Sequence, residues 1–350
     1  MKMNKIITIT TGCLVLVVST MGLLSSCMEK EPSLVPLPVP SFTSVAIAPT
    51  SDSPSNMEFI NTTPKTIAYW FINRVRYQGD TIKATFKYAG DFPVQLIVAG
   101  QGGMDSCTQV VNVPDNNPYA INPTSIQGIL TGARLGLNQR TWTAERVVNS
   151  VIRWNTYNAC IYQITGDRTG APFAFGPADI ATDGTGRDGY FDDKYTFTLG
   201  LGAAPFIYDD NNTVYLDGGG SLWTAALPGA WSSFSGTTSS TDLYNLIQTL
   251  KPWGSGNFTY TILDPPAGPD GINLGQIIVN GIGAHIGLQD KSSDNGVLTT
   301  PSATSVTYDI LRMLTDITDE STGETYDEII LGVTPQTLQA WAFILKSPNH

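Results

Sequence analysis

The stretch Thr85–Val113, TFKYAGDFPVQLIVAGQGGMDSCTQVVNV, contains the clearest strand pattern of the chain. Val94, Leu96 and Val98 alternate with other residues, which is the period-2 spacing of a half-buried β-strand. An AG turn precedes this strand, and a GG turn follows it before the closing TQVVNV. Two strands joined by a glycine turn predict a hairpin at the C-terminal end of a β-sandwich.

The sequence before this hairpin shows the same alternation, in Ile82, Ala84 and Phe86. Residues 41–114 therefore predict one domain of short strands. Through its aromatic triplet YWF, the stretch YAGDFPVQLIV and the closing TQVVNV, this region resembles a PKD domain, an Ig-like β-sandwich of bacterial surface proteins. It departs from the WxFGDG element of that family, where this chain reads WFINRVRYQGD. The resemblance implies a structural spacer, with contact to a ligand as the alternative.

A polar, proline-containing stretch at 115–123, DNNPYAINP, predicts a linker to a second domain. Residues 124–350 predict a larger all-β domain that closes as a β-sandwich or jelly roll. One short helix is expected at Thr241–Leu250, where leucine and isoleucine recur at helical spacing behind a Ser/Thr cap. The expected strands contain the segments Tyr195–Leu199, Phe206–Tyr208, Val214–Leu216, Phe258–Ile262 and Ile277–Val279.

This second region also resembles a known group of proteins. A glycine-marked turn at Gly128 leads, in GILTGARLGLNQRTW, to a strand that carries a tryptophan, and FDDKYTFTL and ILGVTPQTLQAWAFILKSP follow in order. The series is similar to the C-terminal domain of PKD-containing lipoproteins found beside SusC/SusD-type glycan importers of Bacteroidetes. The resemblance implies an accessory surface lipoprotein of the glycan-binding type.

The N-terminus predicts export and lipid attachment. Two lysines precede an uncharged run from Ile6 to Leu24, which is the layout of a signal peptide at 1–26. The run ends in LLSSC and resembles a bacterial lipobox, so Cys27 is the predicted lipidation site; an ordinary secretory signal with a chance cysteine is the alternative. The proline-rich residues 27–40 predict an extended spacer between the lipid anchor and the first domain.

Composition and charge limit the partners. The mature chain would carry 17 basic and 30 acidic residues, a net charge of −13, which argues against nucleic acid or anionic lipid as a partner. Charged residues make up 14% of the chain and hydrophobic residues 41%, a balance typical of many short strands joined by turns. Glu29 and Glu31 resemble the short export signals of Bacteroidetes lipoproteins, so we expect a lipid-anchored protein on the outer face of the outer membrane.

Residues for catalysis are scarce. The chain has two histidines, so a Ser-His-Asp or Cys-His triad depends on His285, which we expect to be packed or at the surface. No ExDxE or ExDxxE pattern occurs, and we expect no enzyme activity; a glycoside hydrolase built from distant carboxylates is the alternative. Cys107 and Cys160 form either one disulfide or two buried thiols, and they lack the CxxC spacing of a metal site.

One acidic loop is a weak candidate for calcium. The stretch ATDGTGRDGYFDD offers Asp183, Asp188 and Asp192 at the irregular spacing that suits a hard, flexible cation. It does not match the spacing of an EF-hand, and a solvated turn is the alternative. We therefore expect no cofactor other than this structural calcium.

The tryptophans give a better candidate for a binding site. Trp142 and Trp341 lie in apolar strand patterns and are expected in the core, whereas other tryptophans lie among glycine, serine and proline. A large ring on a loop either packs locally or receives a ligand, and sugar rings stack on such surfaces while Asn and Asp side chains bind their hydroxyl groups. The predicted ligand-binding residues are Trp223, Trp231, Trp253, Asn257 and Asp264.

These observations predict a surface lipoprotein that binds a polysaccharide or oligosaccharide and passes it to a SusC/SusD-type transporter. Its contact with the membrane would be the lipid anchor. A protein-docking or adhesion lipoprotein, with the loop aromatics facing another protein, is the alternative function.

Overall fold

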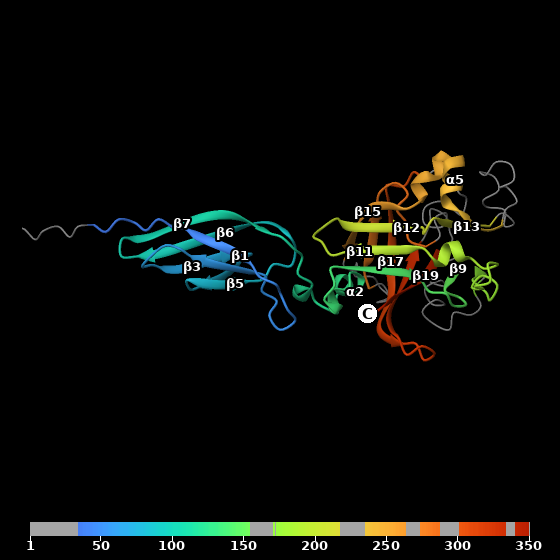
Figure 1. The fold of residues 1–350 in the computed structure, drawn as a ribbon, viewed down its shortest axis with the longest axis horizontal. Helices are drawn as coiled ribbons and strands as arrows, with labels where there is room; N and C mark the ends of the chain where they lie inside the picture. The colour runs from blue at the N-terminus through green and yellow to red at the C-terminus, as the bar shows by residue number, and fades with distance from the viewer. Residues whose placement is uncertain are drawn as a thin grey trace, which may run out of the picture. The chain divides into compact units, whose positions relative to one another are not determined.

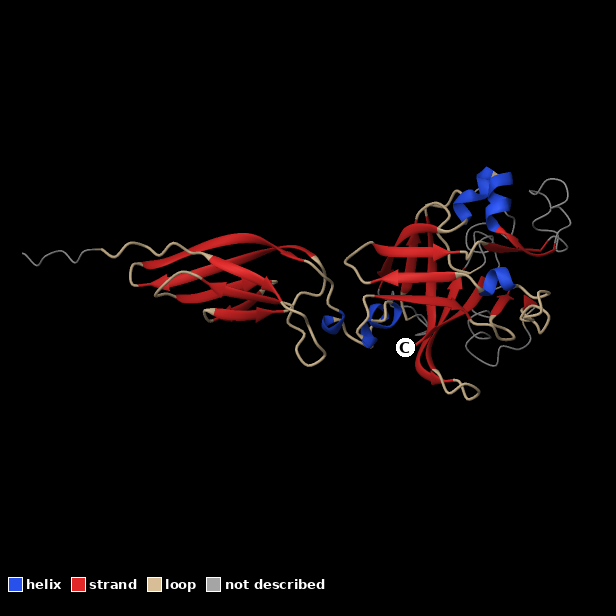
Figure 2. Ribbon diagram, viewed as in Figure 1, coloured by secondary structure: helices blue, strands red, loops and turns tan. Residues whose placement is uncertain are grey.

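The structure is a computed structural model and consists mainly of strands (Figures 1 and 2). It divides into two compact units. The first unit contains Phe59–Ile82, Pro93–Val110 and the described part of Met1–Ser44; the second contains Val45–Glu58, Lys83–Phe92 and the described part of Val111–His350. The structure describes residues 34–154, 171, 173–217, 235–263, 274–287, 301–333 and 340–349.

Seven strands of the N-terminal region form two sheets, with the orders β1-β2-β5 and β4-β3-β6-β7. The hairpin predicted from the opening stretch is confirmed, because β6 and β7 are neighbours in the second sheet on either side of a glycine turn. The strands are β1 (Phe42–Ala46), β2 (Met57–Asn61), β3 (Ile67–Ile72), β4 (Val75–Gln78), β5 (Thr81–Ala84), β6 (Gly90–Gly100) and β7 (Gly103–Val113).

Trp70 joins the inner faces of these two sheets. On β3, Tyr69 and Phe71 point to solvent while Trp70 between them is 1% exposed, as the alternation of a strand requires. The ring of Trp70 lies 5.2 Å from that of Phe42 on β1 and 5.8 Å from that of Phe59 on β2. Aromatic contacts between residues of both sheets are the packing of a β-sandwich.

The larger region contains a ten-stranded antiparallel sheet in the order β10-β9-β19-β18-β17-β16-β15-β12-β11-β8. An additional pairing of β19 with β8, at Leu345 with Ala144 and Lys346 with Thr143, closes eight of these strands into a barrel. The ring consists of β8 (Gln139–Ala144), β11 (Lys194–Thr198), β12 (Ala204–Asp209), β15 (Gly256–Leu263), β16 (Gln276–Asn280), β17 (Ser305–Thr318), β18 (Thr325–Val333) and β19 (Ala340–Pro348).

This closed sheet differs from the sandwich or jelly roll that the sequence predicts for residues 124–350. The all-β class and the expected strands are confirmed, but four of the five expected strands lie in one closed ring of strands, and Val214–Leu216 lies in β13, which pairs with β14 in a separate two-stranded sheet. Alternation along a strand is the same in a sandwich and a barrel, so it does not distinguish them. The pairing that distinguishes a barrel from a sandwich here joins β8 to β19, the first and last strands of the ring.

Side chains fill the interior of the barrel. Alternate residues of each strand point inward, and the largest of them are aromatic. An eight-stranded ring is just wide enough for its side chains to fill it, so this interior is a packed core. Its fully buried aromatic residues include Trp142, Tyr195, Phe197, Phe206, Tyr208, Tyr260 and Tyr308.

A buried ion-pair network connects β8, where the barrel closes, to β18 and β19. Arg140 on β8 donates hydrogen bonds to Asp327 on β18 and to Ser347 on β19, and Arg134 also pairs with Asp327. Burial raises the pKa of Asp327, but the hydrogen bonds from the two arginines hold that pKa below its usual value. The carboxylate of Asp327 therefore balances a guanidinium that would otherwise be buried without a counterion.

The remaining elements are short. The helix predicted at Thr241–Leu250 is observed as α5 followed by a 3₁₀ turn, and Ser239 caps it by accepting a hydrogen bond from Asp242 N at 3.2 Å. Among the described residues, no helix has the length and hydrophobicity needed to cross a membrane. These elements are η1 (Pro118–Ala120), α2 (Ile126–Leu130), η2 (Ala133–Leu135), α4 (Asp188–Phe191), α5 (Ser240–Leu246), η4 (Gln248–Trp253), β9 (Val151–Trp154), β10 (Phe173–Ala174), β13 (Thr213–Asp217) and β14 (Ser235–Ser239).

Candidate functional site

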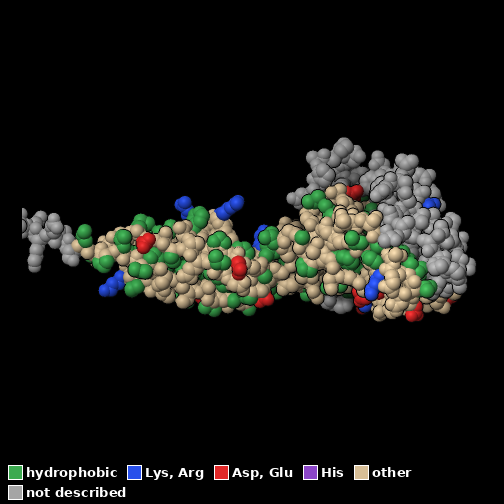
Figure 3. Space-filling model, turned by 90° about the horizontal axis from the view of Figure 1, so that it is seen from above, with side chains coloured by type: hydrophobic (Ala, Val, Ile, Leu, Met, Phe, Trp, Pro, Cys, Tyr) green, Lys and Arg blue, Asp and Glu red, His purple; other side chains and the backbone are tan. Residues whose placement is uncertain are grey.

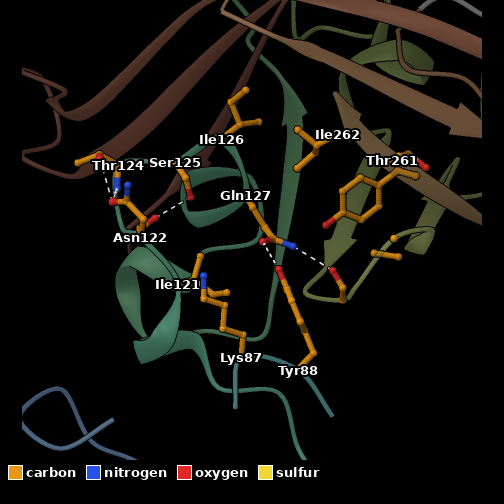
Figure 4. A pocket seen from close by; sticks show the side chains of 14 residues that line it. Lys87, Tyr88, Ile121, Asn122, Thr124, Ser125, Ile126, Gln127, Thr261 and Ile262 are labelled. Carbon is orange, nitrogen blue, oxygen red and sulfur yellow. Dashed lines mark hydrogen bonds between the residues drawn. The ribbon is translucent and has the colours of Figure 1, made fainter. Parts of the chain in front are cut away.

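A groove of about 590 Å³ lies in the second unit, beside α2 (Figure 4). Four segments of that unit form its walls: the end of the stretch after β5, the segment around α2, the β11–β12 turn and the middle of β15. The lining residues are Lys87, Tyr88, Ile121, Asn122, Thr124, Ser125, Ile126, Gln127, Gly200, Gly202, Ala204, Tyr260, Thr261 and Ile262.

Gln127 occupies the middle of the groove. Its Oε1 accepts a hydrogen bond from the Tyr88 hydroxyl at 2.8 Å, and its Nε2 donates to the carbonyl oxygen of Gly200 at 3.0 Å (Figure 4). One amide thus connects three walls of the groove. An amide group has two donors and two acceptor positions, so Gln127 keeps one of each for a ligand.

The segment before α2 gives this wall its shape. Ser125 caps the helix by accepting a hydrogen bond from Gly128 N at 3.0 Å, and the Asn122 carboxamide oxygen accepts from the backbone and hydroxyl of Thr124. Gly128 has to be glycine, because a Cβ there would lie 2.3 Å from the Asn122 carbonyl oxygen. The predicted turn at Gly128 is therefore wrong in detail, since this residue lies inside the short helix α2.

The opposite wall is made by the barrel. On β15, Tyr260 points inward and donates a hydrogen bond to the Thr198 carbonyl oxygen at 3.0 Å, and burial raises the pKa of its hydroxyl. Thr261 points outward into the groove. The β11–β12 turn reaches its rim at Gly202, where φ is +71° and the space around the α-carbon is open.

The chemistry of the groove is that of a binding surface. Its described lining offers hydroxyl and amide groups together with aliphatic side chains, and it contains no carboxylate. Acid–base hydrolysis of a glycosidic bond uses two opposed carboxylates, which this lining does not supply. Sparse charge is general in this protein, and Figure 3 shows few charged side chains on the described surface that it presents. The groove suits a polar ligand, and Lys87 is the one charged side chain in its described lining.

The predicted ligand-binding residues do not gather at this groove. Trp223, Trp231 and Asp264 lie outside the described residues, so their predicted roles stay predictions. Asn257 is exposed on the outward face of β15, the face that carries Thr261, but it does not line the groove.

Trp253 is 2% exposed, and this favours the packing interpretation over ligand stacking. Its ring lies 5.4 Å from that of His285, which in turn lies 4.4 Å from the ring of Tyr208. Gly283 allows this close packing, because a Cβ there would lie 1.7 Å from the carbonyl oxygen of Pro252. The flanking proline and glycine predict a loop at Trp253. In the structure, Pro252 and Gly283 lie against each other, and this contact brings Trp253 next to His285.

His285 is a fully buried, packed residue, as expected. Its Nδ1 is 2.8 Å from the Gly283 carbonyl oxygen, and burial lowers its pKa to about 4. The residues after it are bound to tyrosines of the barrel: Ile286 N donates to Tyr308 and Gly287 N to Tyr195. The segment around His285 therefore packs onto barrel tyrosines, and no serine or cysteine nucleophile is hydrogen-bonded to this imidazole in the described part of the chain.

A buried carboxylate completes this packing. The Tyr208 and Tyr195 hydroxyls donate to Asp193 at 3.0 and 3.3 Å, and burial raises the pKa of the Asp193 carboxyl group well above its usual value. The arrangement satisfies the polar ends of two interior aromatic residues.

The three calcium candidates are not brought together. Asp183 is exposed and accepts hydrogen bonds from Thr185, Asp188 pairs with Arg146 at 2.8 Å, and Asp192 accepts from Thr213 at 2.8 Å. No group of three or more acidic, histidine or cysteine side chains suited to a metal ion occurs among the described residues. The alternative interpretation of this loop, a turn leading into β11, agrees with these contacts.

Two predictions about cysteine fall largely outside the described residues. Cys27, the predicted lipidation site, and Cys160 are not among them. Cys107 is a half-buried free thiol on β7, and burial raises its pKa.

Sequence reasoning missed the groove because its residues come from four distant segments. Tyr88 and Gln127 are 39 residues apart and lie on either side of the predicted linker. The proline-containing polar stretch between them carries no periodic signal.

Comparisons with known proteins give weak similarities. No family model and no curated protein matches the sequence. The PKD1 domain of Vibrio anguillarum Epp is similar at 19% identity over 23% of this chain and 95% of that domain, with a TM-score of 0.19. The PKD1 domain of the Vibrio cholerae metalloprotease PrtV is similar at 21% identity over 22% of this chain and 98% of that domain, also with a TM-score of 0.19.

A third solved structure is similar over most of the chain. It comes from a study of the promiscuous specificity of carbohydrate-binding modules of the β-sandwich superfamily, with 14% identity over 91% of this chain and 93% of that one. Its TM-score is 0.21. The structural neighbours are thus PKD domains and a carbohydrate-binding β-sandwich, and the TM-scores are too low to transfer any role.

Proposed function

We propose that this protein is a lipid-anchored cell-surface lipoprotein that binds polysaccharide in the groove beside α2 and assists a SusC/SusD-type uptake system without catalysing a reaction. The observation that carries the proposal is the groove itself, whose hydroxyl and amide groups surround aliphatic side chains. Sugars present the same combination of hydroxyl groups and apolar C–H faces. The filled interior of the barrel is consistent with a ligand that binds on the surface.

A blocking variant tests this proposal. Thr261→Trp places a large ring in the groove, and Thr259→Trp places the same ring about 7 Å away on the same face of β15, outside the lining. Purified protein, Glu29–His350, is exposed to a panel of polysaccharides by affinity gel electrophoresis and calorimetry. We expect saturable binding to at least one polysaccharide without release of sugar, a loss of about tenfold or more in Thr261→Trp, and none in Thr259→Trp.

Three results would contradict the proposal. Equal affinity of the two variants would remove the groove as the site. Absence of binding across the panel would remove the glycan-binding function, and release of sugar would replace it with an enzyme.

A protein-docking function is the second candidate, and one surface favours it. Ile67, Tyr69 and Phe71 on β3 are all more than a third exposed, and Arg76 on β4 lies 5.5 Å from the Phe71 ring. Exposed aromatic residues with an arginine are frequent at protein interfaces. If this surface docks the transporter, Tyr69→Ser with Phe71→Ser abolishes co-purification with it and leaves polysaccharide affinity unchanged. Unchanged co-purification would exclude this role.

A further inference from the structure

Lys87 is the single charged residue in the described lining of the groove. Its side chain is exposed, and it forms no ion pair in the part of the chain that the structure describes. Figure 4 shows it beside Tyr88, on the same side of the groove. An ammonium group with three donors and no protein counterion is available to an anionic ligand.

The backbone that carries Lys87 is held in place. Its carbonyl oxygen accepts a hydrogen bond from Asn117 N at 3.0 Å, and the next two residues are fixed by the bond from Tyr88 to Gln127 and by Asn116, which accepts from Ala89 N at 2.9 Å. The backbone position from which the lysine side chain extends at the groove is therefore set before a ligand arrives. A charge placed in advance on an ordered backbone loses less entropy on binding.

The local charge at the groove is opposite to that of the whole protein. The chain has a net charge of −11, but no acidic side chain is in the described lining. At physiological ionic strength, charges separated by more than about 8 Å are largely screened, so a ligand in the groove interacts chiefly with Lys87. A carboxylate on the ligand would meet attraction there and no adjacent like charge.

We propose that the groove prefers an acidic polysaccharide, and that Lys87 is the specificity-determining residue that pairs with a sugar carboxylate. This inference rests on the proposed polysaccharide-binding function. The hydroxyl and amide groups of the groove bind the sugar rings, and Lys87 distinguishes an acidic from a neutral sugar.

A pair of polymers that differ in charge alone tests the inference. The probes are polygalacturonate and the neutral galactan obtained by reducing its carboxyl groups, together with the general polysaccharide panel. Calorimetry and affinity gels compare the wild-type protein with Lys87→Met, which keeps the length of the side chain, and with Lys87→Arg, which keeps the charge. Lys83→Met is the matched control, because Lys83 is an exposed lysine on β5 of the same unit and lies outside the lining.

We expect the wild-type protein to bind polygalacturonate about fivefold more tightly than the neutral polymer at physiological ionic strength, as for an exposed ion pair, and to lose this preference in high salt. Lys87→Met lowers affinity for the acidic polymer about fivefold and leaves affinity for the neutral polymer unchanged. Lys87→Arg and Lys83→Met retain the preference.

Two results would overturn the inference, and they are distinguishable. If neutral polymers bind at least as tightly as polygalacturonate and Lys87→Met has no effect, the groove does not discriminate ligands by charge. The proposed polysaccharide-binding function would then stand without this inference. Absence of binding to every polymer would refute the proposed function and this inference with it.

Discussion

The barrel interior and the groove beside α2 lie in the same unit and differ in the polarity of the side chains that form them. The interior is closed and filled with aromatic and aliphatic residues, and the buried carboxylate of Asp327 pairs with two arginines. The groove is open and lined by hydroxyl and amide groups that keep hydrogen-bonding capacity. The difference indicates that the interior supplies stability, and it is the reason for placing the proposed ligand at the surface groove.

Removing the largest interior ring gives the largest expected effect. Trp142 is fully buried, donates a hydrogen bond to the Leu130 carbonyl oxygen at 2.8 Å and lies 4.8 Å from the Arg140 guanidinium. Trp142→Ala should lower the free energy of unfolding by about 3–5 kcal/mol through lost burial and the cavity left behind. Urea denaturation measures this change, and Trp142→Phe should cost less.

A variant in the groove is the control for the unfolding experiment on Trp142→Ala. Thr261→Trp should change the free energy of unfolding by less than about 0.5 kcal/mol, because its side chain lies at the surface. If Trp142→Ala and Thr261→Trp destabilise the protein equally, the division between interior and groove is wrong.

Breaking the ion-pair network should have a comparable but smaller effect. Asp327→Ala leaves Arg140, which is buried, without its carboxylate, and we expect a loss of about 3 kcal/mol in the free energy of unfolding. Asp316→Ala is the control, since Asp316 pairs with Arg134 but its side chain is 64% exposed, and it should cost less than about 1 kcal/mol. Equal losses measured by urea denaturation would show that Asp327 has no special role in closing the barrel.

The smallest of the three effects is a dependence on pH at His285. In the unfolded chain imidazole takes up a proton near pH 6.5, whereas the buried imidazole of the native protein does so near pH 4. Protons therefore bind preferentially to the unfolded state between these values, and the free energy of unfolding falls as the pH is lowered. Between pH 7 and pH 4.5 this group should account for a loss of about 2 kcal/mol.

His285→Gln isolates this contribution. Asp193 is present in both proteins, and its raised pKa acts in the opposite sense, so its effect cancels in the difference between them. We expect the wild-type protein to lose more stability on acidification than the variant, as measured by urea denaturation at both pH values. Parallel pH profiles would contradict the buried, neutral state of His285.

Local sequence patterns predicted the individual strands well, but they did not predict that the strands close into a barrel. The alternating residues of β6, β11 and β12 and the capped helix at α5 could be read from the sequence, because they depend on neighbours within about ten residues. Closure of the barrel depends on β8 meeting β19, some 200 residues later, and no local pattern encodes that pairing. The two-sheet prediction for residues 124–350 was wrong for this reason.

The binding site was harder to predict than the fold. Glycine and proline around Trp253 left local packing and ligand stacking both open, and in the structure Gly283 provides the close approach that buries the ring. The groove residues Tyr88, Gln127 and Thr261 have ordinary side chains in three distant segments, and they share a function only through the fold. Composition and local pattern could not show which polar and aromatic side chains lie close together in the folded chain.

Hydrogen exchange of backbone amides, with and without a bound polysaccharide, tests the central claim most directly. A ligand in the groove should slow exchange at Lys87–Tyr88 and at Asn122–Gln127 and leave the interior strands β11 and β18 unchanged. Protection confined to the barrel strands, or to the segment that carries Trp223 and Trp231, would contradict the assignment of the groove as the binding site.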